Sequence, residues 1–389
     1  MKGNIMRKDI YYKSSAIFVV LFFLVTLTGC YGNIDIEKTT TNNIHTESTT
    51  NNDSRILIDD LHRIGEYNLY ATKLLPNSKL LLCYLTQDLN FCQFKIYDLK
   101  KNIILSESKD ITINQFSVGT LTCLKENFYI ISNQICYIYN FECELIKQIN
   151  IPIDISNNFG KVNFWISNDL EKIVYIDNPN LESQYLYVSD TNYQNKKQIR
   201  LLGDELTITD LFFSSNSKRL GFEGVTIPNG SATSVECYGY IDIDTCETTM
   251  FVDKRIFITY SGDIMIVQSK VADYGIESKG VIKTLDLSTT DKNEFKMLFS
   301  DECENATTSP DGDYLLGMHK DYEHKSVVFN VYYKGKTIET IDYKCLPEEN
   351  YWDFVSSGTE IMLDIETNQI LIFYYDAEKI GYTIKAFEF

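Results

Sequence analysis

The stretch that decides the fold is Ser309-Pro310-Asp311-Gly312-Asp313-Tyr314-Leu315-Leu316, a polar turn followed at once by an apolar segment. The same arrangement returns at a nearly fixed interval along the chain. Its turns open with Ser167, Ser214, Ser261, Ser309 and Ser356, whose numbers differ by 47, 47, 48 and 47. A fixed period of about 40–50 residues is typical of architectures that repeat one small unit of secondary structure. The sequence therefore predicts a chain built from such units.

An apolar segment of β-type composition follows each turn, and a second turn comes later in each unit. The apolar segments are Ile173–Ile176, Leu220–Phe222, Ile264–Val267, Tyr314–Gly317 and Ile361–Leu363. The later turns follow segments that end at or near Asp98, Asn140, Asp190, Asp242 and Asp286. An Asp or Asn side chain at a strand end can accept hydrogen bonds from backbone N–H groups two residues further on, which favours a turn. Weaker copies of the first turn precede Leu80–Leu82 and Phe128–Ile131.

Two turns in each unit imply two hairpins, and hence four short strands in about 47 residues. No stretch sustains the i, i+3, i+4, i+7 spacing that marks a core helix. The sequence therefore predicts an all-β fold, a β-propeller of four-stranded antiparallel blades. Residues 54–389 hold seven blades at this period, and six or eight remain open. We expect Tyr382–Phe387 to be an outer strand, with Arg55–Ile58 as the candidate to close the ring against it.

The motif at Ser309 resembles the S-P-D-G-x-x-[IL]-[AV] signature of TolB-like and WD-like β-propeller repeats. Phe213–Phe222 is a degenerate copy of it. The resemblance covers the chain after residue 53, and it implies that this turn joins the first and second strands of a blade. It also implies that the Asp, Asn and Gly residues of the motif serve the turn rather than chemistry.

The N-terminus has the parts of a bacterial signal peptide. Lys2, Arg7, Lys8 and Lys13 form a positive segment, and the apolar segment Ala16–Leu27 is too short to span about 30 Å of hydrocarbon. It ends in Leu27-Thr28-Gly29-Cys30, which resembles the lipobox of bacterial lipoproteins. The resemblance implies cleavage before Cys30 and attachment of acyl chains such as palmitate to this cysteine. The alternative is an ordinary secretory signal that happens to contain a cysteine.

Residues 30–53 are polar and rich in Thr and Asn, which predicts a flexible tether without a core. The predicted organisation is a signal peptide at 1–29, the lipidated Cys30 with its tether at 30–53 and a propeller domain at 54–389. We expect the lipid to hold the protein on the extracytoplasmic side of the cell membrane. The abundance of Asn, Ile, Lys and Tyr suggests an AT-rich genome, such as that of a Gram-positive bacterium.

The charge limits the classes of partner. The formal net charge is −18 at pH 7, and nucleic-acid binding depends on Lys and Arg contacts with phosphate, so nucleic acid is excluded. The aromatic share of 13 % fits strands and binding loops. We expect a monomer that meets the membrane through its lipid anchor and a protein, peptide or glycan ligand through one face of the propeller.

The sequence shows no constellation that predicts catalysis. The histidines, His45, His62, His319 and His324, are scattered. The G-x-S-x-G motif of the hydrolase domain that accompanies such propellers in serine peptidases is missing, and no D-x-D-x-D-G run predicts a calcium loop. We therefore predict no catalytic residue, no metal ligand and no cofactor.

The cysteines give one candidate disulfide. Nine remain besides Cys30, an odd number without C-x-x-C spacing, which argues against a zinc site and a fully paired framework. Cys83 and Cys92 flank a turn at Gln87-Asp88 symmetrically, so they could face each other across a hairpin. The alternative is that both are small buried side chains.

Three functions are compatible with these features. The leading hypothesis is a membrane-anchored binding or scaffold module without enzymatic activity. The alternative is a propeller enzyme of the lactonase, lyase or cyclotransferase type, which would need polar groups from several blades at the central funnel. A third hypothesis is a structural subunit of an envelope complex, which would need a broad apolar face. A β-propeller fold is compatible with all three functions and does not distinguish between them.

Overall fold

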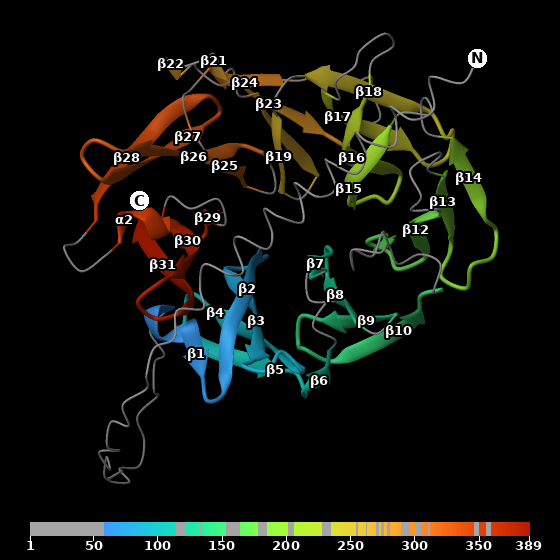
Figure 1. Cartoon of the computed structure of the whole chain (residues 1–389), viewed down its shortest axis with the longest axis horizontal. Coiled ribbons are helices and arrows are strands. Elements are labelled where there is room, and N and C mark those ends of the chain that lie inside the picture. Colours follow the sequence, from blue (N-terminus) through green and yellow to red (C-terminus); the bar gives the residue numbers. More distant parts are fainter. Residues whose placement is uncertain are drawn as a thin grey trace, which may run out of the picture. The chain divides into compact units, whose positions relative to one another are not determined.

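The computed structural model describes residues 58–113, 121–132, 134–152, 164–177, 185–200, 206–227, 235–253, 256–261, 263–269, 272–273, 276–277, 281–288, 296–300, 303, 305–309, 312–345, 350–354 and 359–389. The chain divides into two compact units, Met1–Asp53 and Ser54–Phe389. The first unit lies outside the described residues, and with it the predicted signal peptide, the tether and Cys30. Figure 1 shows the strands of the second unit.

The first three sheets are antiparallel and follow one another in chain order. The first sheet contains β1 (Arg63–Ile64), β2 (Tyr67–Leu75), β3 (Lys79–Thr86), β4 (Phe91–Asp98), β5 (Ile103–Glu107) and β6 (Ile111–Thr112). The second contains β7 (Thr122–Cys123), β8 (Asn127–Ser132), β9 (Ile135–Asn140) and β10 (Leu145–Asn150). The third contains β11 (Phe164–Ile166), β12 (Lys172–Asp177), β13 (Tyr185–Asp190) and β14 (Lys197–Arg200).

Four further antiparallel sheets complete the series. The fourth contains β15 (Thr207–Phe213), β16 (Arg219–Thr226), β17 (Val235–Asp242) and β18 (Thr248–Asp253). The fifth contains β19 (Ile256–Ser261), β20 (Ile264–Ser269), β23 (Val281–Asp286) and β24 (Lys296–Ser300), and the short β21 (Ala272–Asp273) and β22 (Ile276–Glu277) pair with each other. The sixth contains β25 (Asn305–Thr308), β26 (Tyr314–Asp321), β27 (Ser326–Tyr333) and β28 (Lys336–Lys344). The last contains β29 (Glu360–Asp364), β30 (Gln369–Asp376) and β31 (Gly381–Glu388).

The all-β propeller of four-stranded blades is confirmed, but the expected number of seven such blades is wrong. Within the described residues six sheets have four or more strands, and the last sheet has three. The aromatic segment before Ser356 forms the short helix α2 (Tyr351–Phe354) instead of a strand. Its start is fixed by Asn350, whose Oδ1 accepts a hydrogen bond from the Trp352 N–H at 3.3 Å and whose carbonyl oxygen accepts one from the Asp353 N–H at 2.9 Å. Six blades was an alternative that the repeat left open.

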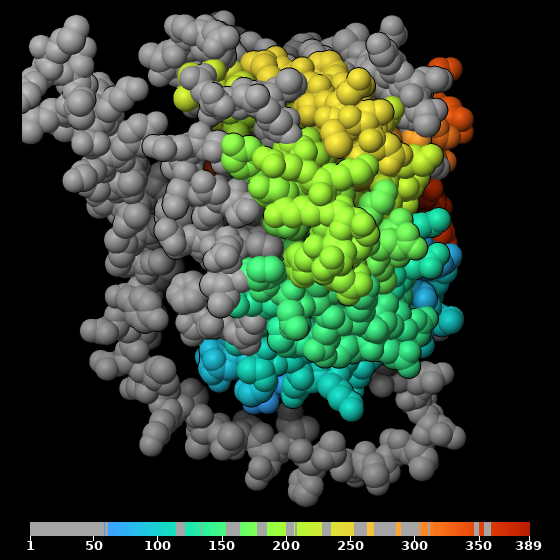
Figure 2. Space-filling model, turned by 90° about the vertical axis from the view of Figure 1, so that its right-hand side faces the viewer, coloured from blue at the N-terminus to red at the C-terminus, as the bar shows by residue number. Residues whose placement is uncertain are grey.

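Buried apolar side chains join each sheet to the next. Among the described residues they form seven clusters, each lying between two neighbouring sheets. Between the first and second sheets, for example, the Phe94 ring centroid lies 4.9 Å from that of Phe128 and 5.5 Å from that of Tyr139. The outer faces of the second, third and fourth sheets, coloured from teal to yellow, adjoin one another in Figure 2. The cluster that contains Leu80 and Leu371 joins the last sheet back to the first, so the sheets form a closed cycle.

The ring closes by side-chain packing at a seam between the first and last sheets. Among the described residues these two sheets share no strand, and Ile58 begins the 3-10 helix η1 (Ile58–His62) rather than a closing strand. Arg55, Ile56 and Leu57 lie outside the described residues. The Tyr382–Phe387 segment does form the outer strand β31, which pairs with β30. The prediction that Arg55–Ile58 forms a closing strand is therefore wrong at Ile58. This residue begins a helix, and Leu61 of that helix packs into the seam.

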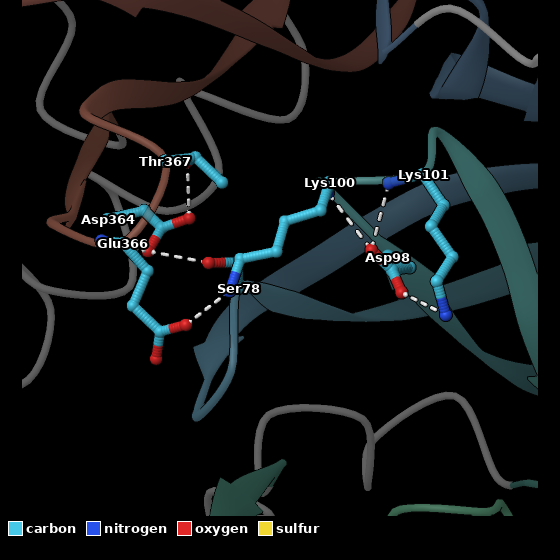
Figure 3. Close-up of polar contacts among 7 residues, drawn as sticks. All are labelled: Ser78, Asp98, Lys100, Lys101, Asp364, Glu366 and Thr367. Carbon is cyan, nitrogen blue, oxygen red and sulfur yellow. Dashed lines mark hydrogen bonds and ion pairs between the residues drawn. The ribbon is translucent and has the colours of Figure 1, made fainter.

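Polar groups cover one end of the seam (Figure 3). The Ser78 hydroxyl donates to Asp364 Oδ1 at 3.1 Å, and Thr367 donates to Asp364 Oδ2 at 2.5 Å. The Lys100 ammonium lies 2.5 Å from Glu366 Oε2. Because Ser78 lies in the β2–β3 turn and Asp364 ends β29 just before the β29–β30 turn, these contacts place both turns at the same end of the propeller. We call this the serine end.

The repeated serines close these turns. Ser167, Ser214 and Ser309 are fully buried, and each hydroxyl oxygen accepts a hydrogen bond at 2.9–3.0 Å from the backbone N–H five residues further on. The backbone N–H of each serine donates in return to the carbonyl oxygen of that same residue. The sequence predicted the position of the turn, but the serine rather than the Asp or Gly provides its central contact.

Replacing Ser214 with alanine is expected to lower the free energy of unfolding by about 1–3 kcal/mol, because it leaves the buried Arg219 N–H without its acceptor. The measurement is urea denaturation followed by circular dichroism. Ser106→Ala is the control, since that hydroxyl makes a weak 3.8 Å contact with the Cys143 sulfur. Equal midpoints for the two variants would contradict the role given to Ser214.

The second turn of each unit also behaves as predicted. Asp98 Oδ1 accepts hydrogen bonds from the backbone N–H groups of Lys100 and Lys101, at 2.9 and 3.0 Å. Asn140, Asp190, Asp242 and Asp286 accept at least one such bond each in the corresponding turns. These side chains thus have a structural role, which removes them from the search for a functional site.

Candidate functional site

Large exposed apolar side chains gather at the end of the propeller opposite the serine end. We call five of them the apolar rim: Tyr70, Tyr322, Trp352, Tyr375 and Ile380. They come from the first, sixth and last sheets and from α2, three sheets that are neighbours in the closed cycle. Leu89 and Phe91, at the β3–β4 turn of the first sheet, are also exposed at this end, whereas Leu105, Leu145 and Ile338 lie on outer strands of separate sheets. The rim is therefore the candidate functional surface.

Two exposed aromatic rings, packed on a buried third ring, form one part of the rim. Trp352 is 59 % exposed and Tyr322 is 49 % exposed, while Tyr351 beneath them is buried. The ring planes of Tyr322 and Trp352 are inclined by 31°, with centroids 6.2 Å apart. Tyr351 lies 6.1 Å from Tyr322 and 5.4 Å from Trp352, at angles of 88° and 67°. Edge contacts of this kind with a buried ring hold the two exposed rings in place.

The turn that carries Tyr322 is fixed by its neighbour Asp321. Asp321 Oδ1 accepts backbone hydrogen bonds from Glu323 and His324 at 3.0 Å, and Oδ2 lies 2.8 Å from His324 Nδ1. The hydrogen bond from the His324 backbone is the largest of the effects that lower the pKa of Asp321. The carboxylate is therefore ionised at neutral pH and rigidly placed next to Tyr322.

Helix α2 connects the aromatic rings to the β30–β31 turn. Asp353, which follows Trp352, accepts a hydrogen bond from Asn350 Nδ2 at 2.9 Å and from the Ala377 backbone N–H at 3.0 Å. In the same turn Ile380 is 78 % exposed with a φ of +51°. A β-branched residue in the left-handed region is strained, at a cost of about 1–3 kcal/mol. The turn thus keeps an apolar side chain in water at a conformational cost.

A row of tyrosines forms the other part of the rim. The Tyr382 ring lies 5.4 Å from Tyr375 and 6.1 Å from Tyr70, edge to face in both cases. It also stacks on Phe373 at 4.9 Å and 12°. The row crosses the seam, because Tyr70 belongs to β2 and the others to the last sheet.

The inner strands carry the polar groups that the enzyme alternative would need. Lys73 on β2 forms a 3.0 Å ion pair with Glu360 on β29, with both side chains nearly half exposed. Burial raises the pKa of the Cys123 thiol on β7 to about 12, and the charge of nearby Lys73 offsets only part of this effect. The thiol is therefore protonated at neutral pH, which is unsuitable for a nucleophile.

The histidines that the sequence analysis named do not form a cluster of metal-ligating side chains in the described part of the chain. His319 Nε2 lies 3.0 Å from Asn330 Nδ2, and His324 contacts Asp321. Within the residues that the structure describes, no group of three or more His, Cys, Asp or Glu side chains could hold a metal ion. In the same residues no helix has the length and apolar character needed to cross a membrane.

Cys83 and Cys92 lie on neighbouring strands but do not face each other as expected. Across the ladder Cys83 is opposite Phe94, and Cys92 is opposite Leu85, so the two cysteines are diagonal neighbours. Both are buried free thiols in the cluster between the first and second sheets. The expectation that they lie directly opposite each other is therefore wrong, because the turn that joins β3 and β4 is centred between Asp88 and Leu89, one residue later than Gln87-Asp88 would require. The disulfide itself stays a prediction.

These buried thiols are expected to resist alkylation in the folded protein. Burial raises the pKa of Cys92 to about 12 and that of Cys143 to about 11, so little thiolate is present at pH 8. We expect iodoacetamide at pH 8 to label partly exposed Cys246 first, and Cys92 only after denaturation, as read by peptide mass spectrometry. The raised pKa of Cys92 also lowers the free energy of unfolding as the pH rises above 9.0, the ordinary pKa of a thiol. In that range the thiol loses its proton in the unfolded chain but keeps it in the folded one. Rapid labelling of native Cys92 would contradict this assignment.

Sequence reasoning missed the apolar rim. A usable signal was present, since Trp352 is one of two tryptophans and lies within the polar stretch Glu348-Glu349-Asn350-Tyr351-Trp352-Asp353. The predicted lipid site, Cys30, lies outside the described residues.

Comparison with known proteins gives likenesses of fold only. No protein family model matches the chain, and no curated protein sequence matches it. Among solved structures, it is similar to the Pyrococcus horikoshii acylaminoacyl peptidase at 14 % identity and a TM-score of 0.37, over 79 % of this chain and 43 % of that one. The chain therefore spans less than half the length of that peptidase.

Two isolated propeller domains are matched over most of their length. The β-propeller domain of the Trilobed protease from Pyrococcus furiosus aligns at 13 % identity and a TM-score of 0.39, over 83 % of this chain and 81 % of that one. The β-propeller domain of Cps50 (Swd1) from Myceliophteria thermophila aligns at 11 % identity and a TM-score of 0.46, over 82 % and 98 %. Since these scores are below 0.5, no function is transferred from them, and the strand pairing and closed cycle of sheets of this chain are what make it a β-propeller.

Proposed function

We propose that this chain is an extracytoplasmic lipoprotein whose β-propeller binds a ligand at the apolar rim and has no enzymatic activity of its own. The lipid on Cys30 and the tether would hold the propeller near the membrane, and the rim would face a protein, peptide or glycan of the envelope. The observation that carries this proposal is the exposure of Tyr322 and Trp352 beside buried Tyr351.

The cost of exposing these groups supports a binding role. Burying an aromatic side chain stabilises a protein by about 1.5–3 kcal/mol, and the rim forgoes part of this gain at several positions. Ile380 adds backbone strain at the same place. Strain and exposed aromatic groups are typical of binding surfaces, so a ligand that covers the rim would recover free energy that folding leaves unused.

The enzyme alternative has weaker support. The polar groups found on the inner strands, Lys73 and Glu360, neutralise each other in an ion pair. The thiol beside them, Cys123, is protonated at neutral pH. This set can bind a polar group, but it contains no group poised as a general base or nucleophile near neutral pH.

The test is retention of the purified chain from Tyr31 to Phe389 on washed cell envelopes. We expect wild type to be retained, and Trp352→Ala combined with Tyr322→Ala to lose most of this retention. Tyr333→Ala is the matched control, because Tyr333 is a similarly exposed tyrosine at the serine end of the same sheet. Equal retention of all three proteins would refute binding through the rim.

A further inference from the structure

The geometry points to a neutral glycan chain as the ligand of the rim, with a sugar ring resting against Trp352 and Tyr322. This inference rests on the proposed binding function and specifies its substrate class. It follows from three properties of the site: its size, its charge and the polar groups next to the rings.

The apolar rim is small for a protein partner. A fully buried aromatic side chain covers about 150–250 Å², so the exposed parts of the five rim residues together offer on the order of 500 Å², of which Trp352 and Tyr322 supply about 200 Å². A stable protein interface needs about 800 Å² on each partner. Two rings inclined by 31° and 6.2 Å apart instead match a ligand with the width of one or two sugar units.

The local charge disfavours an anionic ligand. Among the described residues next to the rings in sequence, Lys320 and Lys325 are outnumbered by Asp321, Glu323 and Asp353. The β30–β31 turn, whose Ala377 N–H bonds to Asp353, adds Asp376 and Glu378 against Lys379. A cationic ligand would gain from such carboxylates, but Asp321, Asp353 and Asp376 already accept backbone hydrogen bonds in their own turns, which reduces their attraction for a free cation.

The polar groups next to the rings suit hydroxyl groups. Exposed Asn350 and His324 flank Trp352 and Tyr322 in sequence, and both side chains are anchored, by Asp353 and Asp321 respectively. The second ring nitrogen of His324 takes no part in that contact. The C–H faces of a pyranose carry partial positive charge that complements the negative face of an aromatic ring, while its hydroxyl edge bonds to planar amide, imidazole and carboxylate groups. Rings and polar groups of this kind therefore recognise a sugar on both its apolar face and its polar edge.

The experiment uses tryptophan fluorescence of the chain from Tyr31 to Phe389. Of the two tryptophans, Trp165 is buried at 7 % exposure and Trp352 is 59 % exposed, so acrylamide quenching reports mainly on Trp352. The probes are chitohexaose, cellohexaose and maltohexaose as neutral glycans, and hexalysine as a cation. We expect at least one glycan to protect Trp352 saturably and hexalysine to give no protection.

Variants locate the site. His324→Ala is expected to weaken glycan affinity at least about threefold and Tyr322→Ala at least about tenfold, whereas Tyr333→Ala leaves it unchanged. Circular dichroism of each variant checks that it is folded. Protection by hexalysine but by none of the glycans would overturn the glycan assignment while leaving the rim as a binding surface. Lack of protection by any of the three glycans at millimolar concentration would also overturn it, and envelope retention would then show separately whether the proposed function stands.

Discussion

Replacing Cys30 with alanine is expected to move the protein from the membrane fraction to the culture medium. The thiolate of Cys30 is the group to which the diacylglyceryl moiety of the proposed anchor would be attached, and no other side chain in the predicted lipobox could replace it. One acyl chain binds a membrane only marginally, at about 0.8 kcal/mol per buried CH₂, whereas two or three chains hold stably. Loss of the anchor should therefore be nearly complete. The measurement is quantification of the protein in membranes and medium, with mass spectrometry of the N-terminal peptide.

The control is Cys345→Ala, which changes a partly exposed cysteine far along the chain and should leave the protein in the membrane. If wild type were found unlipidated in the medium, the anchor would be wrong and the chain would be a freely secreted propeller. The distinction matters for binding as well. A flexible tether of 24 residues spans roughly 25 Å, so the anchored propeller would meet only ligands close to the membrane surface.

The fold could be predicted because its determinants are local. The contacts of Ser214 and Asp98 lie within five residues of each side chain, so the same short motif produces the same turn wherever it occurs. Two such turns in each repeat of about 47 residues imply two hairpins, and therefore four strands in each unit. The last unit departed from the pattern for an equally local reason, since Asn350 caps a helical turn where a strand was expected.

The apolar rim could not be predicted because exposure is a tertiary property. Tyr351 and Trp352 are adjacent and similar in the sequence, yet one is buried and the other is 59 % exposed. The difference arises because Tyr351 packs into the cluster between the sixth and last sheets, together with Tyr374. One sequence without that packing partner gives no basis for separating the two residues. The predicted pairing of Cys83 with Cys92 across the hairpin was wrong for a related reason, since the pairing depends on where the β3–β4 turn is centred.

Replacing Leu371 with alanine is expected to lower the free energy of unfolding by about 2–5 kcal/mol, by removing a fully buried side chain from the seam between the last and first sheets. Leu105→Ala is the matched control, because Leu105 is 40 % exposed on β5 and should cost far less. Urea denaturation monitored by near-UV circular dichroism measures both, with the slope showing whether the transition stays cooperative. Similar midpoints for the two variants would contradict closure of the ring at Leu371.

The contacts between the first and last sheets indicate which forces hold the seam. In the described residues no strand is shared across it, so backbone hydrogen bonds do not join the first and last sheets there. The Lys100–Glu366 and Lys73–Glu360 pairs are nearly half exposed and are screened by water and salt. The buried hydrogen bond from Ser78 to Asp364 adds about 1.5–3 kcal/mol. Apolar packing of Leu371 in one cluster with residues such as Leu80 and Tyr97 then provides most of the remaining closure. In 1 M sodium chloride the Debye length falls to about 3 Å, which screens exposed ion pairs. We therefore expect the loss of unfolding free energy caused by Leu371→Ala to be the same in this salt as without it. If ion pairs held the seam, the salt would lower the free energy of unfolding of the wild-type protein itself.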